Sequence, residues 1–168
     1  RYGNVMGSRG SVIPFFTSIK DTGTVPITDP RMTRFMISLE DGVELVWHAF
    51  DDMVGGEIYV KKIPSMFITD VAEAAAPGAA QKVIGIRPGE KLHEQMIGLE
   101  DAASTFEYDE YYKILPVINN WSDDATRIKD GVKVAEDFVY DSNNNTDWMS
   151  VNTLRKWIGD NQDKLGKF

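Results

Sequence analysis

The stretch Arg-Tyr-Gly-Asn-Val-Met-Gly-Ser-Arg-Gly-Ser-Val-Ile-Pro-Phe-Phe, residues 1–16, decides the fold class. Its first five residues have the pattern of a short strand, and a loop rich in Gly and Ser leads from them into an apolar segment that begins a helix. α/β folds use a strand, a glycine-rich loop and a helix N-terminus in this order to present backbone N–H groups to phosphates. We therefore expect an α/β protein. No initiator Met precedes the stretch, so we also expect a chain that begins inside a longer one.

Composition limits the classes of protein that this chain can represent. Its 168 residues are 42% hydrophobic and 11% aromatic, which is enough for a packed core. The net charge of −8 argues against a nucleic-acid-binding surface, so any bound anion has to be held by a few local Arg or Lys side chains. There is no cysteine, which excludes disulfides, thiolate nucleophiles and cysteine-ligated metals. No apolar run approaches the roughly 20 residues of a membrane span, and we expect a cytoplasmic protein without membrane contact.

Strand patterns and helix patterns alternate along the chain, as they do in α/β and α+β proteins. Ser38, with Asp41 three residues later, predicts the start of the longest helix by the pattern of a capping box. The apolar stripe of this helix includes Trp47, which we interpret as a core or interface anchor. The expected helices cover 11–20, 38–50, 69–76 and 150–158, and the expected strands cover 1–5, 25–28, 34–37, 57–60, 82–86 and 137–140.

Five motifs in a fixed order carry a resemblance to a known family. They are residues 1–14, Ile-Thr-Asp-Pro-Arg-Met-Thr-Arg-Phe (27–35), Gly-Gly-Glu-Ile-Tyr-Val (55–60), Lys-Ile-Pro-Ser-Met (62–66) and Ile-Gly-Ile-Arg-Pro-Gly-Glu-Lys-Leu-His-Glu (84–94). Together they closely resemble the C-terminal half of inverting UDP-N-acetylglucosamine 4,6-dehydratases. These are extended short-chain dehydrogenase/reductases that make precursors of pseudaminic acid and related surface sugars. The resemblance covers nearly the whole chain and is weakest over 119–133.

The resemblance implies a domain organisation and an activity. Residues 1–20 would form the end of a Rossmann dinucleotide-binding domain with the substrate-loop helix, and residues 21–168 the small α+β substrate domain. The cofactor loop GxxGxxG and the Tyr-x-x-x-Lys and Asp-Lys pairs of the family would lie before residue 1, so no catalytic residue is expected in this chain. The complete enzyme would use NADP to take hydride from carbon 4 of UDP-N-acetylglucosamine. Water would then leave from carbon 6 and hydride return there, with carbon 5 inverted. Its implied partners are the missing Rossmann half and further copies in a homo-oligomer.

The part of the site that remains here should hold the nucleotide sugar. The resemblance implies that Asn4 contacts the sugar nucleotide and that Val5 lies beside the nicotinamide end of the cofactor. It also implies that Ser11 and Val12, at a helix N-terminus, lie against the base and the diphosphate. The alternatives are turn hydrogen bonds for Asn4 and a simple helix cap for Ser11. Arg9, in the glycine-rich loop, either reaches phosphate or is solvated.

Two arginines are the main candidates for the diphosphate. Arg34 is the strongest, because a guanidinium makes charge-assisted, forked contacts to phosphate oxygens. Arg31 is its competitor, and either could instead form a surface ion pair. Arg87 precedes Pro-Gly in a rigid turn after a strand, and we expect it to make a second diphosphate contact. Glu90 is expected to accept hydrogen bonds from ribose hydroxyls, the alternative being an Arg87–Glu90 surface pair.

Other interpretations of the chain stay open. His93 lies near two glutamates but has no third ligand at a suitable spacing, so a packing role beside the site is favoured over a metal site. The chain could be a non-catalytic UDP-sugar-binding or assembly module. It could also belong to a related UDP-sugar epimerase or retaining dehydratase, because the residues that deliver protons lie outside it. A last alternative is a remnant that folds poorly because its first strand has lost its sheet neighbours.

Overall fold

The computed structural model describes residues 1–166, apart from the side chains of residues 119, 120 and 122. Helices and strands alternate along the chain, as expected. The helices are α1 (Val12–Ile19), α2 (Leu39–Asp52), α3 (Ile68–Ala75), α4 (Leu99–Ala102), α5 (Ala125–Ile128) and α6 (Val151–Asp160), with 3₁₀ turns at Lys20–Thr22 and Ile118–Asp123. The strands are β1 (Asn4–Val5), β2 (Thr24–Ile27), β3 (Thr33–Ile37), β4 (Ile58–Lys61), β5 (Ser65–Phe67), β6 (Ala80–Val83), β7 (Gln95–Ile97), β8 (Thr105–Glu107), β9 (Tyr111–Ile114), β10 (Val132–Lys133) and β11 (Tyr140–Asp141).

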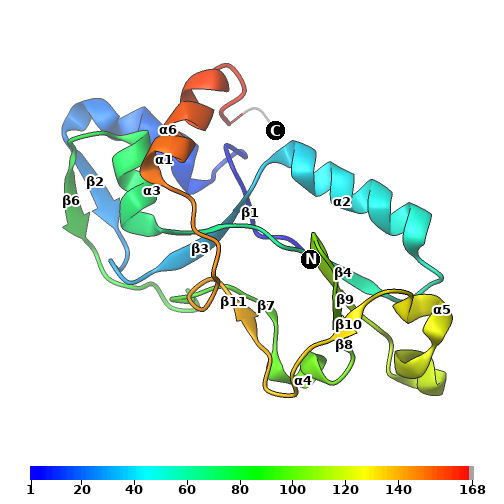
Figure 1. Cartoon of the computed structure of the whole chain (residues 1–168). Helices are drawn as coiled ribbons and strands as arrows, with labels where there is room; N and C mark the ends of the chain where they lie inside the picture. Colours follow the sequence, from blue (N-terminus) through cyan, green and yellow to red (C-terminus); the bar gives the residue numbers. More distant parts are fainter. Residues whose placement is uncertain (167–168) are drawn as a thin grey trace.

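The strands form four small sheets with both parallel and antiparallel pairs. β1 pairs with β3 in parallel and β3 with β5 in antiparallel fashion, while β2 and β6 form a parallel pair. The largest sheet is antiparallel in the order β10-β8-β9-β4, and β11 pairs with β7. Figure 1 shows α1, α3 and α6 grouped beside β2 and β6 at one end, the four-stranded sheet at the other end, and α2 extending along one side. The expected α/β class is confirmed at this level.

Strand β3 separates two hydrophobic cores, because alternate side chains of a strand point to opposite faces. Met36 belongs to the first core, which α1, β2, α3 and α6 enclose. Phe35 and Ile37 belong to the second core, which includes side chains of β4, β7, β9 and β11. Arg34 is two residues from Met36 and therefore shares its face. The alternation of this one strand thus decides which side chains reach the first core and which the second.

Several sequence predictions about element boundaries are confirmed and others are wrong. Ser38 and Ser150 cap α2 and α6, each accepting a hydrogen bond from the backbone N–H three residues later, at 3.0 and 3.1 Å. The first strand is shorter than expected, because only Asn4 and Val5 pair with β3. The strand expected over 82–86 ends at Val83, and the residues beyond it form an exposed loop. The strand expected over 137–140 begins only at its last residue, in β11.

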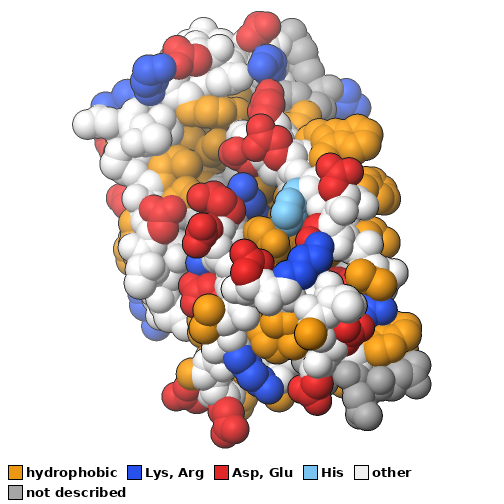
Figure 2. Space-filling model, turned by 45° about the vertical axis from the view of Figure 1, so that its right-hand side comes forward, with side chains coloured by type: hydrophobic (Ala, Val, Ile, Leu, Met, Phe, Trp, Pro, Cys, Tyr) orange, Lys and Arg blue, Asp and Glu red, His pale blue; other side chains and the backbone are white. Residues whose placement is uncertain are grey.

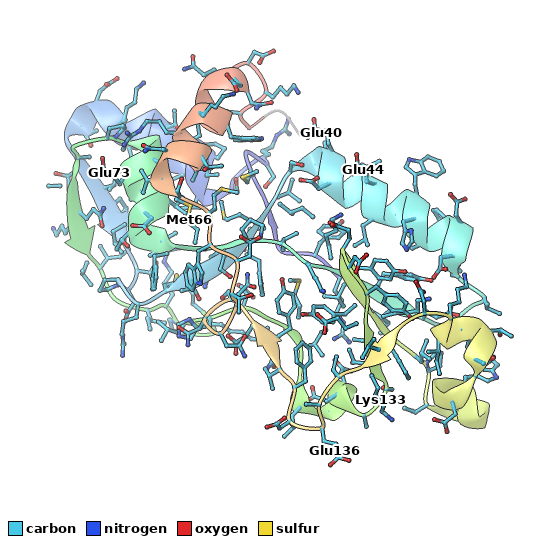
Figure 3. The ribbon with its side chains drawn as sticks, viewed as in Figure 1. Glu40, Glu44, Met66, Glu73, Lys133 and Glu136 are labelled. Atoms are coloured by element: carbon cyan, nitrogen blue, oxygen red, sulfur yellow. The ribbon has the colours of Figure 1, made fainter. Side chains whose placement is uncertain are left out.

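The apolar stripe of α2 lies on the surface of the described chain. Of its residues only Gly42 and Leu45 are buried, while Trp47 and Phe50 are each 64% exposed. Trp47 is therefore not a core anchor of this chain. Figure 3 shows Glu40 and Glu44 along the same helix, and Figure 2, in which this side is turned forward, shows hydrophobic side chains exposed among charged ones. Few described elements pack on α2, so its apolar face stays uncovered.

A buried ion pair fastens the C-terminal end of α2 to the four-stranded sheet. The Lys113 side chain on β9 is 1% exposed, and its Nζ lies 2.6 Å from Oδ2 of Asp52. Tyr59 donates a hydrogen bond to the same oxygen at 2.6 Å, and Lys129 pairs with the other one. Burial alone would raise the pKa of Asp52, but the hydrogen bonds from Lys113, Lys129 and Tyr59 outweigh it, and the pKa lies well below its usual range.

None of the described helices is long and apolar enough to cross a membrane.

Replacing Asp52 with Asn should destabilise the fold, because it leaves the buried Lys113 ammonium without its counter-charge. We expect the free energy of unfolding to fall by about 3–5 kcal/mol, as for other broken buried pairs. Urea denaturation at pH 7 measures it, with the exposed neighbour Asp51→Asn as the control. Because the folded pKa of Asp52 is lowered, its contribution is present above roughly pH 4 and declines as the pH falls below that value. Equal unfolding midpoints for the two variants would contradict this role.

Candidate functional site

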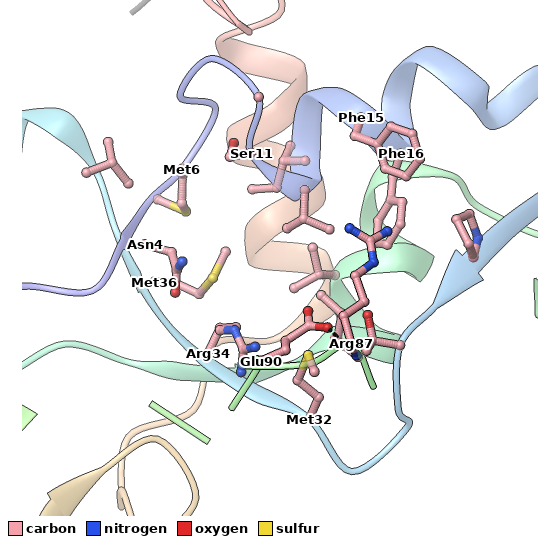
Figure 4. Close-up of a pocket in the computed structure, with 18 of the residues that line it drawn as sticks. Asn4, Met6, Ser11, Phe15, Phe16, Met32, Arg34, Met36, Arg87 and Glu90 are labelled. Atoms are coloured by element: carbon pink, nitrogen blue, oxygen red, sulfur yellow. Dashed lines mark hydrogen bonds between the residues drawn. The ribbon is translucent and has the colours of Figure 1, made fainter. Parts of the chain in front are cut away.

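A cavity of about 430 Å³ opens between α1, β3 and the loop after β6. Its volume lies within the range of small-molecule sites. Figure 4 shows Ser11 and the first turn of α1 on one wall, Asn4 and Met36 on the opposite wall, and Glu90 between Arg34 and Arg87. The lining residues are Asn4, Val5, Met6, Gly10, Ser11, Val12, Ile13, Phe15, Phe16, Pro26, Thr28, Met32, Arg34, Met36, Ile68, Val71, Ile84, Arg87 and Glu90. Every predicted site residue except Arg9 is therefore at this cavity.

The N-terminus of α1 opens toward the cavity without a side-chain cap. Ser11 occupies the N-cap position in an extended conformation, but its hydroxyl accepts no hydrogen bond from the first turn. It donates instead to the carbonyl of Ser8 at 2.7 Å. Gly10, with φ of 74°, provides the left-handed turn that leads into the helix. The cap alternative for the Ser11 hydroxyl is thus not observed, and the amides of Val12 and Ile13 have no side-chain acceptor among the described residues.

Arg87 presents a free guanidinium on the other side of the cavity. Among the residues that the structure describes, its side chain has no hydrogen-bond or ion-pair partner, and Figure 4 shows it turned toward α1. The Glu90 carboxylate accepts a hydrogen bond from the backbone N–H of Arg87 at 3.2 Å, so it stabilises the turn and not the guanidinium. Gly89, with φ of 81°, completes that turn. The alternative of an Arg87–Glu90 surface ion pair is therefore not observed.

Arg34 lies at the cavity with most of its donors engaged. Its side chain is 12% exposed. One terminal nitrogen donates to the carbonyls of Thr33 at 2.7 Å and Leu92 at 3.1 Å, and the other donates to the carbonyl of Lys91 at 2.9 Å. Its Nε lies 3.4 Å from Oε1 of Glu94. Burial lowers the pKa of the guanidinium and the carboxylate of Glu94 offsets part of the shift, so the group stays charged. Its expected contact with phosphate stays a prediction.

The two remaining basic candidates point away from the cavity. Arg9 is exposed, and its Nε donates to the carbonyl of Gly166 at 3.4 Å, so its predicted place at the site is not found. Arg31 forms a two-point ion pair with Asp29 at 3.0 and 2.8 Å on the surface. These hydrogen bonds lower the pKa of Asp29 to about 2. Of the two arginines in this motif that were candidates for the diphosphate, Arg31 is thus the one on the surface.

A buried network of hydroxyl groups holds the chain segment that follows the loop. Thr33 Oγ1 lies 2.7 Å from Nδ1 of His93 and 2.7 Å from Oγ of Ser142. The Ser142 hydroxyl accepts a further hydrogen bond from the backbone N–H of Glu94 at 2.9 Å. His93 is thus hydrogen-bonded to Thr33 on β3, and the expected packing role beside the site stays a prediction. No group of His, Asp or Glu suited to a metal ion occurs in the part of the chain that the structure describes.

Most of the apolar side chains that line the cavity were not predicted from the sequence. Met6, Met32 and Met36 face the cavity together with the aromatic pair Phe15 and Phe16. These side chains come from the strand, the loop and the helix of the same motifs that supplied the polar candidates. Alternation along β3 could have identified Met36, which must share the face of Arg34. The methionines have flexible, polarisable side chains that can adapt to the shape of a ligand.

Comparisons with known proteins show what this chain is similar to. Residues 1–116 match the family profile described as polysaccharide biosynthesis protein. The chain is 52% identical over 166 residues to a UDP-N-acetylglucosamine 4,6-dehydratase (inverting) of Campylobacter jejuni subsp. jejuni serotype O:2, with 94% of this chain and 49% of that protein covered. The expected resemblance to inverting dehydratases is confirmed.

Other relatives are similar over less of the chain or at lower identity. A UDP-glucose 4-epimerase of Rickettsia canadensis is 45% identical over 119 residues, with 68% of this chain and 35% of that protein covered. The X-ray structure of Pen from Bacillus thuringiensis superposes with a TM-score of 0.77 at 32% identity, with 98% of this chain and 48% of that one covered. The chain thus spans about half the length of the curated relatives that it matches most fully.

Replacing Thr33 with Val should weaken the support of the site without changing side-chain volume much. His93 and Ser142 would lose their shared partner, and we expect a loss of about 1–3 kcal/mol in the free energy of unfolding. Thr24→Val, at an exposed position in β2, is the matched control. Urea denaturation compares the two variants. A loss no larger for Thr33→Val than for Thr24→Val would show that the network does not stabilise the fold.

Proposed function

Because this chain belongs to the family of polysaccharide biosynthesis proteins, we propose that it is the nucleotide-sugar-binding portion of a UDP-N-acetylglucosamine 4,6-dehydratase that inverts carbon 5. The single observation that carries the proposal is the free guanidinium of Arg87, which faces the uncapped N-terminus of α1 across the cavity. A cation and free backbone amides on two sides of one cavity suit a diphosphate. The identity to the inverting dehydratases supports the choice of sugar nucleotide.

The proposed division of the chain follows the same family. Residues 1–20 would complete a Rossmann dinucleotide-binding domain, and residues 21–168 would form the substrate domain of an extended short-chain dehydrogenase/reductase. The parallel pairing of β1 with β3 supports this assignment, because a parallel sheet is how such domains continue. The cavity would then lie where the two parts meet. This location is common for ligand sites in proteins with more than one domain.

Several residues at the cavity receive a task in the proposal. The amides of Val12 and Ile13 and the side chain of Arg87 would bind the diphosphate, and Glu90 would accept hydrogen bonds from ribose. Asn4 would contact the sugar. The apolar lining would cover the base and exclude water, which strengthens the polar contacts. These assignments rest on the positions of the side chains at one cavity.

Residues present here fit the edge of a nicotinamide site. Val5 is half-buried at the end of β1, next to the exposed Asn4, so it offers an apolar contact beside the sugar. The removal of hydride from carbon 4 and its return to carbon 6 is chemistry that bound NADP supplies. This chain would orient the sugar, while the groups that move protons would come from the other half of the complete enzyme. That enzyme is proposed to be a cytoplasmic homo-oligomer.

The apolar face of α2 supports a missing partner half. Its exposed residues include Val43, Val46, Trp47 and Phe50, and a patch of this kind marks an interaction surface. The relatives are about twice as long as this chain. We therefore propose that the dinucleotide-binding half covers this face.

Replacing Arg87 with Ala should weaken the binding of UDP to the complete protein. Loss of one charge-assisted contact predicts a dissociation constant about 10–100 times larger at low salt. Lys82→Ala, at an exposed position on β6 outside the cavity, removes the same charge and is the matched control. Isothermal titration calorimetry measures both variants. An unchanged affinity in Arg87→Ala would contradict the assignment of the diphosphate to this cavity.

The double replacement Trp47→Glu and Phe50→Glu tests the proposed cover of α2. Both side chains are exposed here, so the unfolding temperature of residues 1–168 should hardly change. In the complete protein the charges would be buried at the domain contact, and we expect a drop of at least several degrees. Glu44→Gln on the same helix is the control. Equal changes in the long and the short chain would argue against a docked half at this face.

The similarity to UDP-glucose 4-epimerases suggests a second candidate activity, which can be tested. The UDP-glucose 4-epimerases of Rickettsia share 44–45% identity with this chain over 119 residues. Both activities begin at carbon 4, and the nucleotide contacts proposed here would serve either of them. The product of the complete enzyme with UDP-N-acetylglucosamine distinguishes them by NMR. Loss of water supports the dehydratase, inversion at carbon 4 without loss of water supports an epimerase, and binding without turnover supports a non-catalytic module.

A further inference from the structure

We infer that Arg34 is a positioning residue that clamps the loop carrying Arg87, and that it is not itself a ligand of the diphosphate. The inference rests on the proposed function, because it assigns a part to Arg34 in the same site. Arg87 would supply the charge that meets the ligand. Arg34 would decide where that charge is held.

The contacts of Arg34 join two separate parts of the chain. Its own strand accepts one hydrogen bond, at the carbonyl of Thr33. The end of the loop accepts two, at the carbonyls of Lys91 and Leu92, and its continuation places the Glu94 carboxylate at 3.4 Å. One planar guanidinium thus binds β3 to the segment that follows Arg87 by four to seven residues. No side chain with fewer donors could reach all of these acceptors at once.

Little else among the described residues holds the loop between its ends. At its start, the backbone N–H of Ile84 bonds to the carbonyl of Ile27 at 2.8 Å. The turn from Arg87 to Glu90 contains only its own hydrogen bonds, one to the carboxylate and one to the backbone carbonyl. Residues 81–89 are all exposed, so no core packing fixes them. The position of the Arg87 side chain therefore depends on anchors at the two ends of the loop. At the second end, Arg34 bonds to the carbonyls of Lys91 and Leu92. It shares this end with the backbone N–H of Thr33, which bonds to the carbonyl of Leu92 at 3.1 Å, and with the hydroxyl network that begins at His93.

The donors of Arg34 leave little for a phosphate. A guanidinium has five N–H groups. Three of them make hydrogen bonds to carbonyls and the Nε group faces Glu94, so one is left. Burial lowers the pKa of Arg34, and the carboxylates of Glu94 and Glu90 lie close enough to offset part of that lowering, so they would also repel an approaching anion. The Glu90 carboxylate is also near Arg87, but the Arg87 guanidinium has no hydrogen-bond or ion-pair partner among the described residues, so all of its N–H groups are available.

Arg34→Lys separates positioning from charge, because it keeps the cation but cannot bond to three carbonyls and a carboxylate in one plane. In the complete protein we expect UDP to bind about tenfold more weakly to Arg34→Lys. In the Arg87→Ala background the same replacement should change the affinity less than about twofold, because the residue it positions is gone. Arg31→Lys, an exposed arginine in the same motif, is the control and should bind UDP like the wild type.

Hydrogen exchange without ligand gives a readout that a phosphate contact would not move. The hydrogen-bonded amides in residues 84–92 are those of Ile84, Arg87 and Glu90. They should exchange faster in Arg34→Lys than in the wild type, whereas Arg87→Ala should leave their exchange unchanged. The global unfolding temperature should be similar in both. If Arg34→Lys does not fold, Glu94→Gln removes one clamp partner and should produce a smaller increase in the same amides.

Two results would overturn the inference. One is unchanged exchange over residues 84–92 in Arg34→Lys or, where that variant does not fold, in Glu94→Gln. The other is a loss of UDP affinity that multiplies with the loss from Arg87→Ala, which would show direct contact with the phosphate. Failure of the wild type to bind UDP would count against the proposed function instead, and the exchange experiment would then still decide whether Arg34 clamps the loop.

Discussion

The alternation of side chains along β3 is the constraint on which the rest of the structure depends. Phe35 and Ile37 point into one hydrophobic core, while Arg34 and Met36 point to the opposite face, where the other core borders the cavity. A slip of one residue in the pairing with β1 or β5 would exchange these faces and bury the guanidinium among apolar side chains. Packing therefore fixes the position of the charge at the site.

Some charged side chains of this molecule stabilise its structure, and others remain available to bind a ligand. Lys113 is buried and paired with Asp52, so its charge connects α2 to the four-stranded sheet. Arg34 is nearly buried and bonds to the backbone. Arg87 alone of these three is exposed and has no partner among the described residues. The chain has a net charge of −8, so the field of the whole molecule disfavours a bound anion. The Arg87 guanidinium and the open amides of α1 make this cavity a local exception.

Much of the fold and part of the site could be predicted from the sequence. Motif spacing and capping patterns identified α1, α2 and α6, and the family resemblance brought together Asn4, Ser11 and Arg87 from distant segments. Two kinds of feature could not be predicted. The partners of Arg34 are mainly backbone carbonyls, which leave no mark in the residue types. The exposure of α2 depends on what packs against the helix, and an amphipathic pattern is the same whether the partner is in this chain or outside it.

A crystal structure of the complete protein with UDP-N-acetylglucosamine bound tests the central claim most directly. The account predicts the diphosphate in the cavity between α1 and the loop after β6, within hydrogen-bond distance of the Arg87 guanidinium and of the amides of Val12 and Ile13. The Arg34 guanidinium should keep its bonds to the carbonyls of Lys91 and Leu92. A nucleotide bound outside this cavity, or in it with Arg87 turned into solvent, would contradict the account.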